Sequence, residues 1–150
     1  DTETLIEQVL KELNIHSTKK ILDIGTGCGC IIISILKERK RCSGVGIDIS
    51  KNAVKLAKYN AKIQHIDNRI KFLNSDIDNF YRDKYDLIVS NPPYIESFKI
   101  NDLEDDVKSH EPRVALDGGV DGYKKIKLII KKSSILIKNI MVYSNKGIQQ

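Results

Sequence analysis

The sequence lacks the long hydrophobic runs of a membrane protein. No apolar run approaches the ~20 residues that a membrane-spanning helix needs, and the acidic, polar start from Asp1 to Thr4 is unlike a signal peptide. Cysteine is also scarce: there are three, two of them in Cys28-Gly29-Cys30, which argues against a disulfide framework. These absences exclude membrane-spanning and disulfide-rich proteins, and we expect a protein of the reducing cytoplasm.

The chain does contain enough apolar sequence for one packed domain. Hydrophobic residues make up 41% of the 150 residues and charged residues 30%, which excludes wholesale disorder. We therefore expect residues 1–150 to form a single core.

Acidic residues are absent after Asp121. The net charge is +5, and the segment from Gly122 to Gln150 carries seven lysines. Such a segment could contact nucleic acid, but that signature also needs interleaved arginines or aromatic residues. We favour a solvated lysine face on a helix, and we do not expect direct nucleic-acid binding.

Short apolar segments alternate with amphipathic ones along the chain. Strands are expected at 21–24, 44–48, 70–73, 85–90 and 140–143, and helices at 4–13, 31–39, 51–62 and 122–136. Ser50 is a plausible N-cap for the third helix. This alternation predicts an α/β fold with a mostly parallel sheet and helices on both faces. Ligands of such sheets bind beyond the carboxyl ends of the strands.

The first strand ends in a glycine-rich turn, Asp23-Ile24-Gly25-Thr26-Gly27-Cys28-Gly29. The glycines permit a tight turn and let a ligand approach the backbone at a helix N-terminus. The G-x-G-x-G spacing differs from the dinucleotide pattern G-x-G-x-x-G, and the leading Asp23 suits a cationic ligand better than a pyrophosphate. The alternative is that the glycines only close a strand–helix turn.

Two further acidic residues stand at strand ends. Asp48 ends the second strand, where a carboxylate can accept hydrogen bonds from both hydroxyls of a ribose. It could instead cap the next helix, although Ser50 competes for that role. Asp76 ends the third strand, where it could accept from the exocyclic amine of an adenine ring while Ile77 covers the ring. A simple turn aspartate is an equally good interpretation of Asp76.

The fourth strand ends in Asn91-Pro92-Pro93-Tyr94, the sharpest functional signal in the sequence. A planar amino group is a poor nucleophile, and a site can assist it by accepting hydrogen bonds from its N–H groups. The side-chain oxygen of Asn91 and the carbonyl of Pro92 offer two acceptors, and proline fixes the carbonyl direction. Tyr94 can stack on the planar group and exclude water. The alternative is a diproline loop without function.

Together these motifs resemble those of the class I S-adenosylmethionine-dependent amino-methyltransferases, a Rossmann-like fold. The block His110-Glu111-Pro112-Arg113-Val114-Ala115-Leu116-Asp117-Gly118-Gly119 resembles the segment that marks the peptide-chain-release-factor glutamine methyltransferases. The opening Asp1-Thr2-Glu3-Thr4-Leu5 also resembles the start of that family's catalytic domain. The resemblance covers nearly all of the chain.

The resemblance implies a cofactor, a substrate and a set of site residues. The cofactor would be S-adenosyl-L-methionine, with S-adenosyl-L-homocysteine as product, and the substrate a glutamine in the Gly-Gly-Gln loop of a peptide chain release factor. The implied cofactor-binding residues are Asp23, Gly25, Thr26, Gly27, Cys28, Gly29, Asp48, Asp76, Ile77 and Asn91. Asn91, Pro92 and Tyr94 would be catalytic, and Asn91, Pro92, Pro93, Tyr94 and Glu111 would bind the substrate. Glu111 could alternatively form an exposed pair with Arg113.

The sequence also departs from that family. Members of the family carry an N-terminal helical domain, and we find no counterpart of that domain in these 150 residues. Ile77 stands where the family often has a bulkier residue. Gly147 to Gln150 resembles the opening of the helix after the fifth strand, so the last strand pair of the usual sheet is missing. We therefore expect a sheet truncated to about five strands, with an unpaired edge beside the fifth.

Two alternatives to glutamine methylation stay open. The Asn-Pro-Pro-Tyr motif is shared with methyltransferases that act on the amino groups of nucleic-acid bases, although such enzymes usually need an added recognition region. The missing segments also allow a non-catalytic remnant that binds S-adenosylmethionine. A nucleophilic triad and metal-ligand spacing are not apparent, and neither is needed when the methyl group is already electrophilic.

Overall fold

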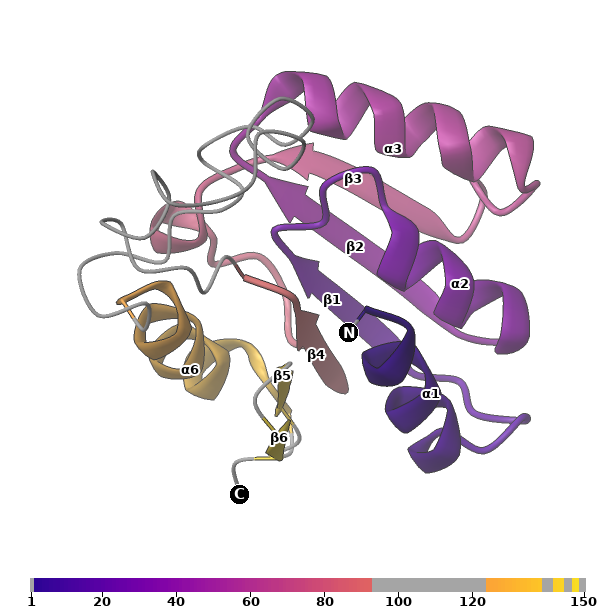
Figure 1. Cartoon of the computed structure of the whole chain (residues 1–150), viewed down its shortest axis with the longest axis horizontal. Helices are drawn as coiled ribbons and strands as arrows, with labels where there is room; N and C mark the ends of the chain where they lie inside the picture. The colour runs from indigo at the N-terminus through magenta and orange to yellow at the C-terminus, as the bar shows by residue number, and fades with distance from the viewer. Residues whose placement is uncertain (1, 93–123, 139–141, 145–146, 149–150) are drawn as a thin grey trace, which may run out of the picture. The chain divides into compact units, whose positions relative to one another are not determined.

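The structure is a computed structural model that describes residues 2–92, 124–138, 142–144 and 147–148 (Figure 1). Its elements are α1 (Thr2–Glu12), β1 (Lys20–Ile24), α2 (Cys30–Glu38), β2 (Ser43–Asp48), α3 (Lys51–Ile63), β3 (Ile70–Asn74), η1 (Ile77–Asn79), β4 (Leu87–Ser90), α6 (Lys124–Leu136), β5 (Val142–Ser144) and β6 (Gly147–Ile148). The chain divides into two compact units, Asp1–Asn91 with Ser133–Gln150, and Pro92–Lys132. All the strands of the sheet belong to the first unit.

The strands form one sheet in the order β3-β2-β1-β4-β5-β6. Strands β1 to β5 run parallel, as the alternating sequence pattern predicts. The chain proceeds from β1 outward to β3 and then returns to place β4 on the other side of β1. The order of strands therefore reverses between β1 and β4, and the carboxyl ends of these strands form the crevice where open α/β sheets bind ligands.

The expectation of an unpaired edge beside the fifth strand is wrong, because β6 pairs there. β6 is antiparallel to β5, with Tyr143 opposite Ile148 and Ser144 opposite Gly147. The expected opening of a helix from Gly147 is therefore a short strand. Two residues separate Ser144 from Gly147, and this spacing is typical of a β-hairpin. Pairing across the hairpin satisfies backbone groups that an open edge would leave exposed.

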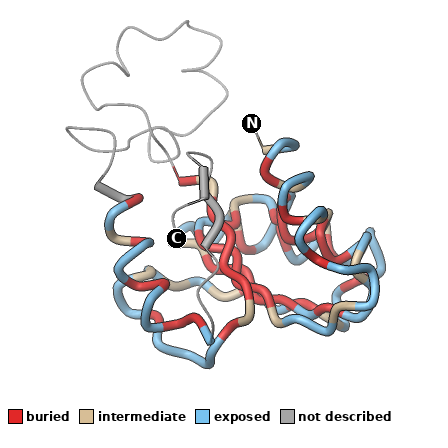
Figure 2. Tube along the Cα trace, turned by 90° about the horizontal axis from the view of Figure 1, so that it is seen from below, coloured by how far each residue is buried: buried red, intermediate tan, exposed pale blue. Residues whose placement is uncertain are grey.

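One face of the sheet packs against α1, α2 and α3 (Figure 1). The buried cluster there joins residues of the three helices to alternate residues of the strands: Leu5, Val9, Ile32, Ile35, Leu36, Val54, Ala57, Ile21, Phe72, Leu87 and Val89. Successive strand residues point to opposite faces, so Leu22, Ile24 and Ile88 lie on the other face, where they are also buried. Figure 2 shows this burial along the strands and on the inner sides of the helices.

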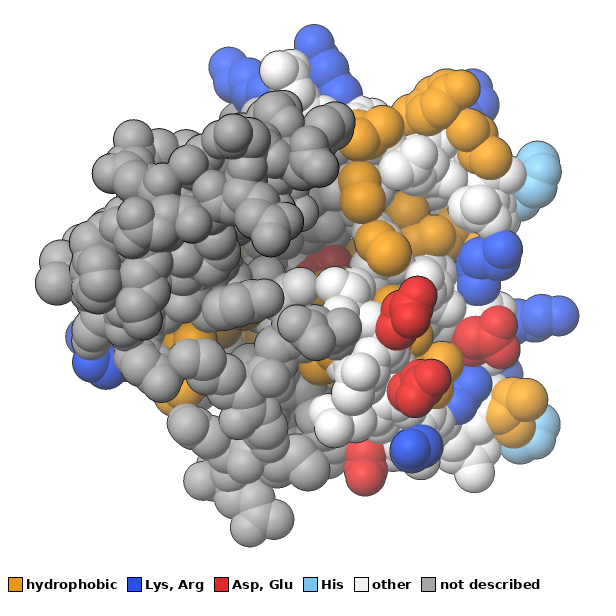
Figure 3. All heavy atoms as spheres, viewed as in Figure 1, with side chains coloured by type: hydrophobic (Ala, Val, Ile, Leu, Met, Phe, Trp, Pro, Cys, Tyr) orange, Lys and Arg blue, Asp and Glu red, His pale blue; other side chains and the backbone are white. Residues whose placement is uncertain are grey.

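The helix boundaries follow local sequence signals. Ser50 caps α3, because its hydroxyl accepts a hydrogen bond from the amide of Ala53 at 3.2 Å, as predicted. The outward side of α3 carries three exposed apolar residues, Leu56, Tyr59 and Ile63, and hydrophobic side chains gather over this helix in Figure 3. In the part of the chain that is described, no helix has the length and apolar character to cross a membrane.

The fourth strand is shorter than predicted. β4 begins at Leu87, whereas Tyr85 forms an isolated parallel bridge with Ile137. The amide of Tyr85 donates to the carbonyl of Leu136 at 2.8 Å, and its carbonyl accepts from the amide of Lys138 at 2.8 Å. Tyr85 thus pairs with the segment after α6.

Candidate active site

The glycine turn between β1 and α2 adopts a backbone that only glycine takes easily. Gly25, Gly27 and Gly29 have φ angles of 70°, 55° and 85°. A Cβ added at Gly25 or at Gly27 would meet no atom of the described residues within 4 Å, so in this part of the chain both glycines border open space. At Gly29 a Cβ would lie 2.9 Å from Cδ1 of Ile33, so this glycine is needed for packing. The turn therefore leaves its first two glycines open to a ligand.

Hydrogen bonds to β2 and α3 hold the turn in place. The amides of Gly25 and Thr26 donate to the carbonyl of Ile47 at 2.9 and 3.0 Å. From α3, the side-chain amide of Asn60 donates to the carbonyl of Cys28 at 2.9 Å. The turn is thus anchored on both sides by neighbouring elements, and its open backbone is pre-arranged.

Asp48, at the end of β2, is the third anchor of the turn. One carboxylate oxygen accepts a hydrogen bond from the amide of Gly27 at 2.9 Å, and the other accepts from the amide of Ser50 at 2.8 Å. The cap of α3 is supplied by Ser50, so Asp48 is not needed for that role. Its half-buried carboxylate stands beside the turn, where a ribose could reach its remaining lone pairs.

Asp23 is completely buried beneath the turn. One of its carboxylate oxygens accepts a hydrogen bond from the Thr26 hydroxyl at 2.7 Å, and the other has no hydrogen-bond partner among the described residues. Burial raises the pKa of Asp23 to about 7, although the Thr26 hydrogen bond opposes the shift. A buried carboxyl with a vacant acceptor suits a ligand that brings positive charge or a donor.

The start of α2 lies in acidic surroundings. Burial raises the pKa of the Cys30 thiol, and the neighbouring Cys28, Asp23 and Glu3 raise it further. Glu3 belongs to the first turn of α1, so the beginning of that helix lies near the glycine turn. The thiol of Cys30 is therefore held in its neutral form.

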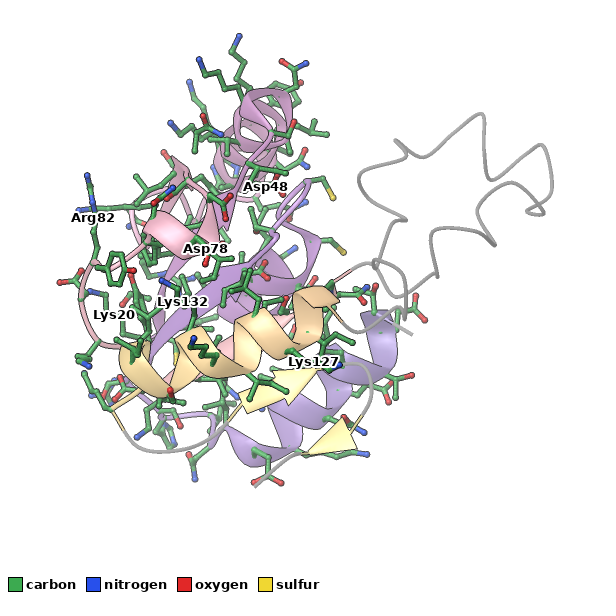
Figure 4. The ribbon with its side chains drawn as sticks, turned by 90° about the vertical axis from the view of Figure 1, so that its left-hand side faces the viewer. Lys20, Asp48, Asp78, Arg82, Lys127 and Lys132 are labelled. Carbon is green, nitrogen blue, oxygen red and sulfur yellow. The ribbon has the colours of Figure 1, made fainter. Side chains whose placement is uncertain are left out.

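Asp76 and Ile77 follow β3. Asp76 is exposed and caps η1, since its carboxylate accepts from the amide of Asp78 at 3.1 Å, and Ile77 is half-buried. The structure thus contains the turn contact that sequence reasoning held equally plausible for Asp76. Asp48 ends β2 and Asp78 lies in η1, after β3, and both side chains are labelled in Figure 4.

Asn91 lies at the end of β4, next to β1. The register pairs Ile24 with Ser90, and the Ser90 hydroxyl donates to the carbonyl of Ile24 at 2.7 Å. The side-chain amide of the half-buried Asn91 donates to the hydroxyl of Thr2 at 3.1 Å. Pro92 is buried. The sheet therefore brings the first residue of the Asn-Pro-Pro-Tyr motif to the strand that carries the glycine turn.

Three predicted site residues, Pro93, Tyr94 and Glu111, lie outside the described residues. Sequence reasoning missed side chains that contact the predicted site, among them Thr2, which contacts Asn91, and Asn60, which contacts Cys28. Thr2 belongs to the opening stretch that resembles the family, which was the available signal. For Asn60 the sequence holds no signal beyond its place in a helix.

Comparison with known proteins agrees with this geometry. The family model described as methyltransferase small domain matches residues 2–107. The release factor glutamine methyltransferase of Caulobacter vibrioides is 42% identical over 123 residues, covering 81% of this chain and 43% of that protein. The protein of the same name from Agrobacterium fabrum is 37% identical and aligns with 100% of this chain and 54% of its own length. The chain spans about half the length of these curated relatives.

Solved structures resemble the fold at low sequence identity. Coclaurine N-methyltransferase bound to N-methylheliamine and S-adenosylhomocysteine superposes with a TM-score of 0.65 and 13% identity, over 95% of this chain and 35% of that chain. A methyltransferase of Thiobacillus denitrificans in complex with S-adenosyl-L-homocysteine superposes with a TM-score of 0.52 and 21% sequence identity. The superposition covers 59% of this chain and 36% of that chain. The predicted Rossmann-like methyltransferase fold is confirmed. The chain belongs to the methyltransferase small domain family, and the relatives confirm its resemblance to the release factor glutamine methyltransferases.

Proposed function

We propose that this protein transfers a methyl group from S-adenosyl-L-methionine to the side-chain amide nitrogen of a glutamine in a peptide chain release factor. The observation that carries the proposal is the position of Asn91. It ends β4 beside the strand that leads into the open glycine turn, at the point where the strand order reverses. A cofactor on the turn and an amide held by Asn91 would share one crevice.

Two features of the chain's own residues fit S-adenosylmethionine. Among the described residues, nothing fills the space beside Gly25 and Gly27, which would let a ligand approach the backbone, and one oxygen of Asp23 has no partner there and would suit the cationic methionine part. In this proposal Asp48 binds the ribose, and Asp76 and Ile77 flank the adenine. When bound, S-adenosylmethionine supplies an electrophilic methyl group.

The chain's part in the reaction is orientation and electrostatic stabilisation. An amide nitrogen is a weak nucleophile because its lone pair is delocalised into the carbonyl. The oxygen of Asn91 and the carbonyl of Pro92 would accept from its N–H groups and stabilise the positive charge that develops on the nitrogen. Pro93 and Tyr94 would complete the pocket, with the ring of Tyr94 against the planar amide. Glu111 would line the pocket wall.

We propose a release factor as the substrate because the chain is similar to proteins named release factor glutamine methyltransferase. The particular glutamine, in the Gly-Gly-Gln loop, comes from the motif resemblance. That residues 1–150 form one methyltransferase core, and that it works in the cytoplasm, remain predictions.

A methylation assay with mass spectrometry tests the proposal. The chain is incubated with S-adenosylmethionine and a release factor, and the Gly-Gly-Gln peptide is examined for one added methyl group. A release factor with alanine in place of that glutamine is the matched control. Asn91→Ala should lose most of the turnover with little change in cofactor affinity, because Asn91 is proposed to bind the acceptor.

Two other outcomes would replace the proposal. Methylation of an adenine or cytosine amine in DNA or RNA oligonucleotides, with none of the release factor, would favour a base methyltransferase. Calorimetric titration with S-adenosylmethionine and S-adenosylhomocysteine distinguishes an active enzyme from a non-catalytic protein that only binds the cofactor. Binding of the cofactor without transfer to any of these acceptors would identify a non-catalytic binding protein.

A further inference from the structure

The first residue of α1 contacts the candidate catalytic asparagine. The hydroxyl of Thr2 accepts a hydrogen bond from the side-chain amide of Asn91 at 3.1 Å, across 89 positions in the sequence. Both side chains are half-buried. Because the amide nitrogen of Asn91 donates to Thr2, the amide oxygen is turned away from that contact.

α1 is anchored well enough to hold another side chain in place. Leu5 and Val9 are buried against α2 in the core cluster, at 1% and 0% exposure. Near its other end, the guanidinium of Arg39 donates to the carbonyl of Leu13 at 2.7 Å and also to the carbonyl of Leu10. Thr2 therefore projects from a helix that is packed along its length and bound at its far end.

An asparagine that must present its oxygen to a substrate needs such a partner. The terminal side-chain torsion of asparagine has a broad, roughly two-fold energy profile. The NH₂ group and the oxygen of the amide are similar in shape and differ in that one donates and the other accepts hydrogen bonds. A half-turn would present an NH₂ group to the NH₂ group of the acceptor amide, and two donors do not pair. Misplacement of about 1 Å can cost a reaction roughly a hundredfold in rate.

We propose that Thr2 is a positioning residue for Asn91, which fixes the plane of its side chain so that its oxygen faces the methyl acceptor. This inference rests on the proposed function, since it assigns Thr2 a part in the same site. It adds the first turn of α1 to a site that the motifs place on the strand ends alone.

Three variants test the inference. Thr2→Val keeps the shape of the side chain and removes the hydroxyl, whereas Thr2→Ser keeps the hydroxyl. Thr4→Val makes the same change two residues along α1, where the side chain is exposed. We expect Thr2→Val to lower kcat about tenfold to a hundredfold with an unchanged Kd for S-adenosylhomocysteine. Thr2→Ser should restore most of kcat, and Thr4→Val should behave as the wild type.

The side-chain amide signals of Asn91 in a ¹⁵N-correlated NMR spectrum provide a second readout. Asn91→Asp assigns them by their disappearance, and Thr2→Val should shift them while Thr4→Val should not. Wild-type kcat in Thr2→Val would overturn the inference and leave the proposed function standing. A wild-type protein that binds S-adenosylhomocysteine but methylates no release factor would overturn the proposed function. In that case unshifted Asn91 signals in Thr2→Val would overturn the inference as well.

Discussion

The carboxylate of Asp48 accepts a hydrogen bond from the backbone amide of Gly27 at 2.9 Å, which ties the end of β2 to the turn after β1. The other carboxylate oxygen accepts from the amide of Ser50 at the start of α3. One side chain therefore links three elements at the carboxyl edge of the sheet. In the proposed function, the same carboxylate binds the ribose, so a single residue shapes the turn and contacts the ligand.

Replacing Asp48 should weaken cofactor binding more than catalysis. Asp48→Ala removes charged hydrogen bonds worth about 1–3 kcal/mol, which corresponds to a rise of roughly 5- to 150-fold in the Kd for S-adenosylhomocysteine. Calorimetric titration measures this, with kcat determined at saturating cofactor. Asp67→Ala, at an exposed acid before β3, is the matched control. An unchanged Kd in Asp48→Ala would remove this residue from the proposed site.

The pKa of Asp23, raised to about 7 by burial, predicts a pH-dependent stability. An unfolded aspartate ionises near pH 4, so the folded state holds its proton more tightly than the unfolded state. The protonated Asp23 carboxyl therefore adds to the free energy of unfolding, and this contribution is fully present below pH 4. It is lost as the pH rises to 7, and the loss is on the order of 4 kcal/mol. Asp23→Asn cannot ionise, so its Tm relative to the wild type should rise between pH 4 and pH 8.

Thermal unfolding without cofactor, at several pH values, measures this difference. Asp67→Asn serves as the matched control, because it makes the same change at an exposed carboxyl. A constant difference in Tm between Asp23→Asn and the wild type across this range would show that Asp23 titrates normally.

Most of the sheet and the glycine turn could be predicted from the sequence because their signals are local. Alternating apolar segments identified the five parallel strands, and the spacing of Gly25, Gly27 and Gly29 identified a turn that needs positive φ angles. The capping role of Ser50 was predicted for the same reason, since a cap involves residues three positions apart.

The features that sequence reasoning missed depend on contacts between distant residues. The hydrogen bond from Asn91 to Thr2 joins residues 89 positions apart, and the bond from Asn60 to Cys28 joins a helix to a turn. β6 was missed because two residues are too few to show a strand pattern. No propensity or period encodes such contacts, which arise only when the sheet has assembled.

The glycines of the turn should divide into two kinds when each is replaced by alanine. Gly29→Ala adds a Cβ 2.9 Å from Ile33 and 3.1 Å from Phe72, besides the strain of a left-handed backbone of about 1–2 kcal/mol. Gly25→Ala adds only the strain as far as the described residues are concerned, because none of their atoms lies within 4 Å of the added Cβ. Gly29→Ala should therefore lower Tm more than Gly25→Ala does. Gly25→Ala should raise the Kd for the cofactor by more than its small loss of Tm would account for. The assignment of Gly25 to the site fails if Gly25→Ala binds S-adenosylhomocysteine as the wild type does.

Asn60 should support cofactor binding without touching the ligand, because its side-chain amide holds the carbonyl of Cys28 at 2.9 Å. Asn60→Ala removes a hydrogen bond worth about 0.5–1.5 kcal/mol and frees the far side of the turn. We expect the Kd for S-adenosylhomocysteine to rise by roughly 2- to 12-fold, with kcat at saturating cofactor unchanged. Asn52→Ala, at an exposed asparagine of the same helix, controls for the loss of an amide from α3. Equal affinities in the two variants would mean that the bonds from Ile47 and Asp48 hold the turn without help from α3.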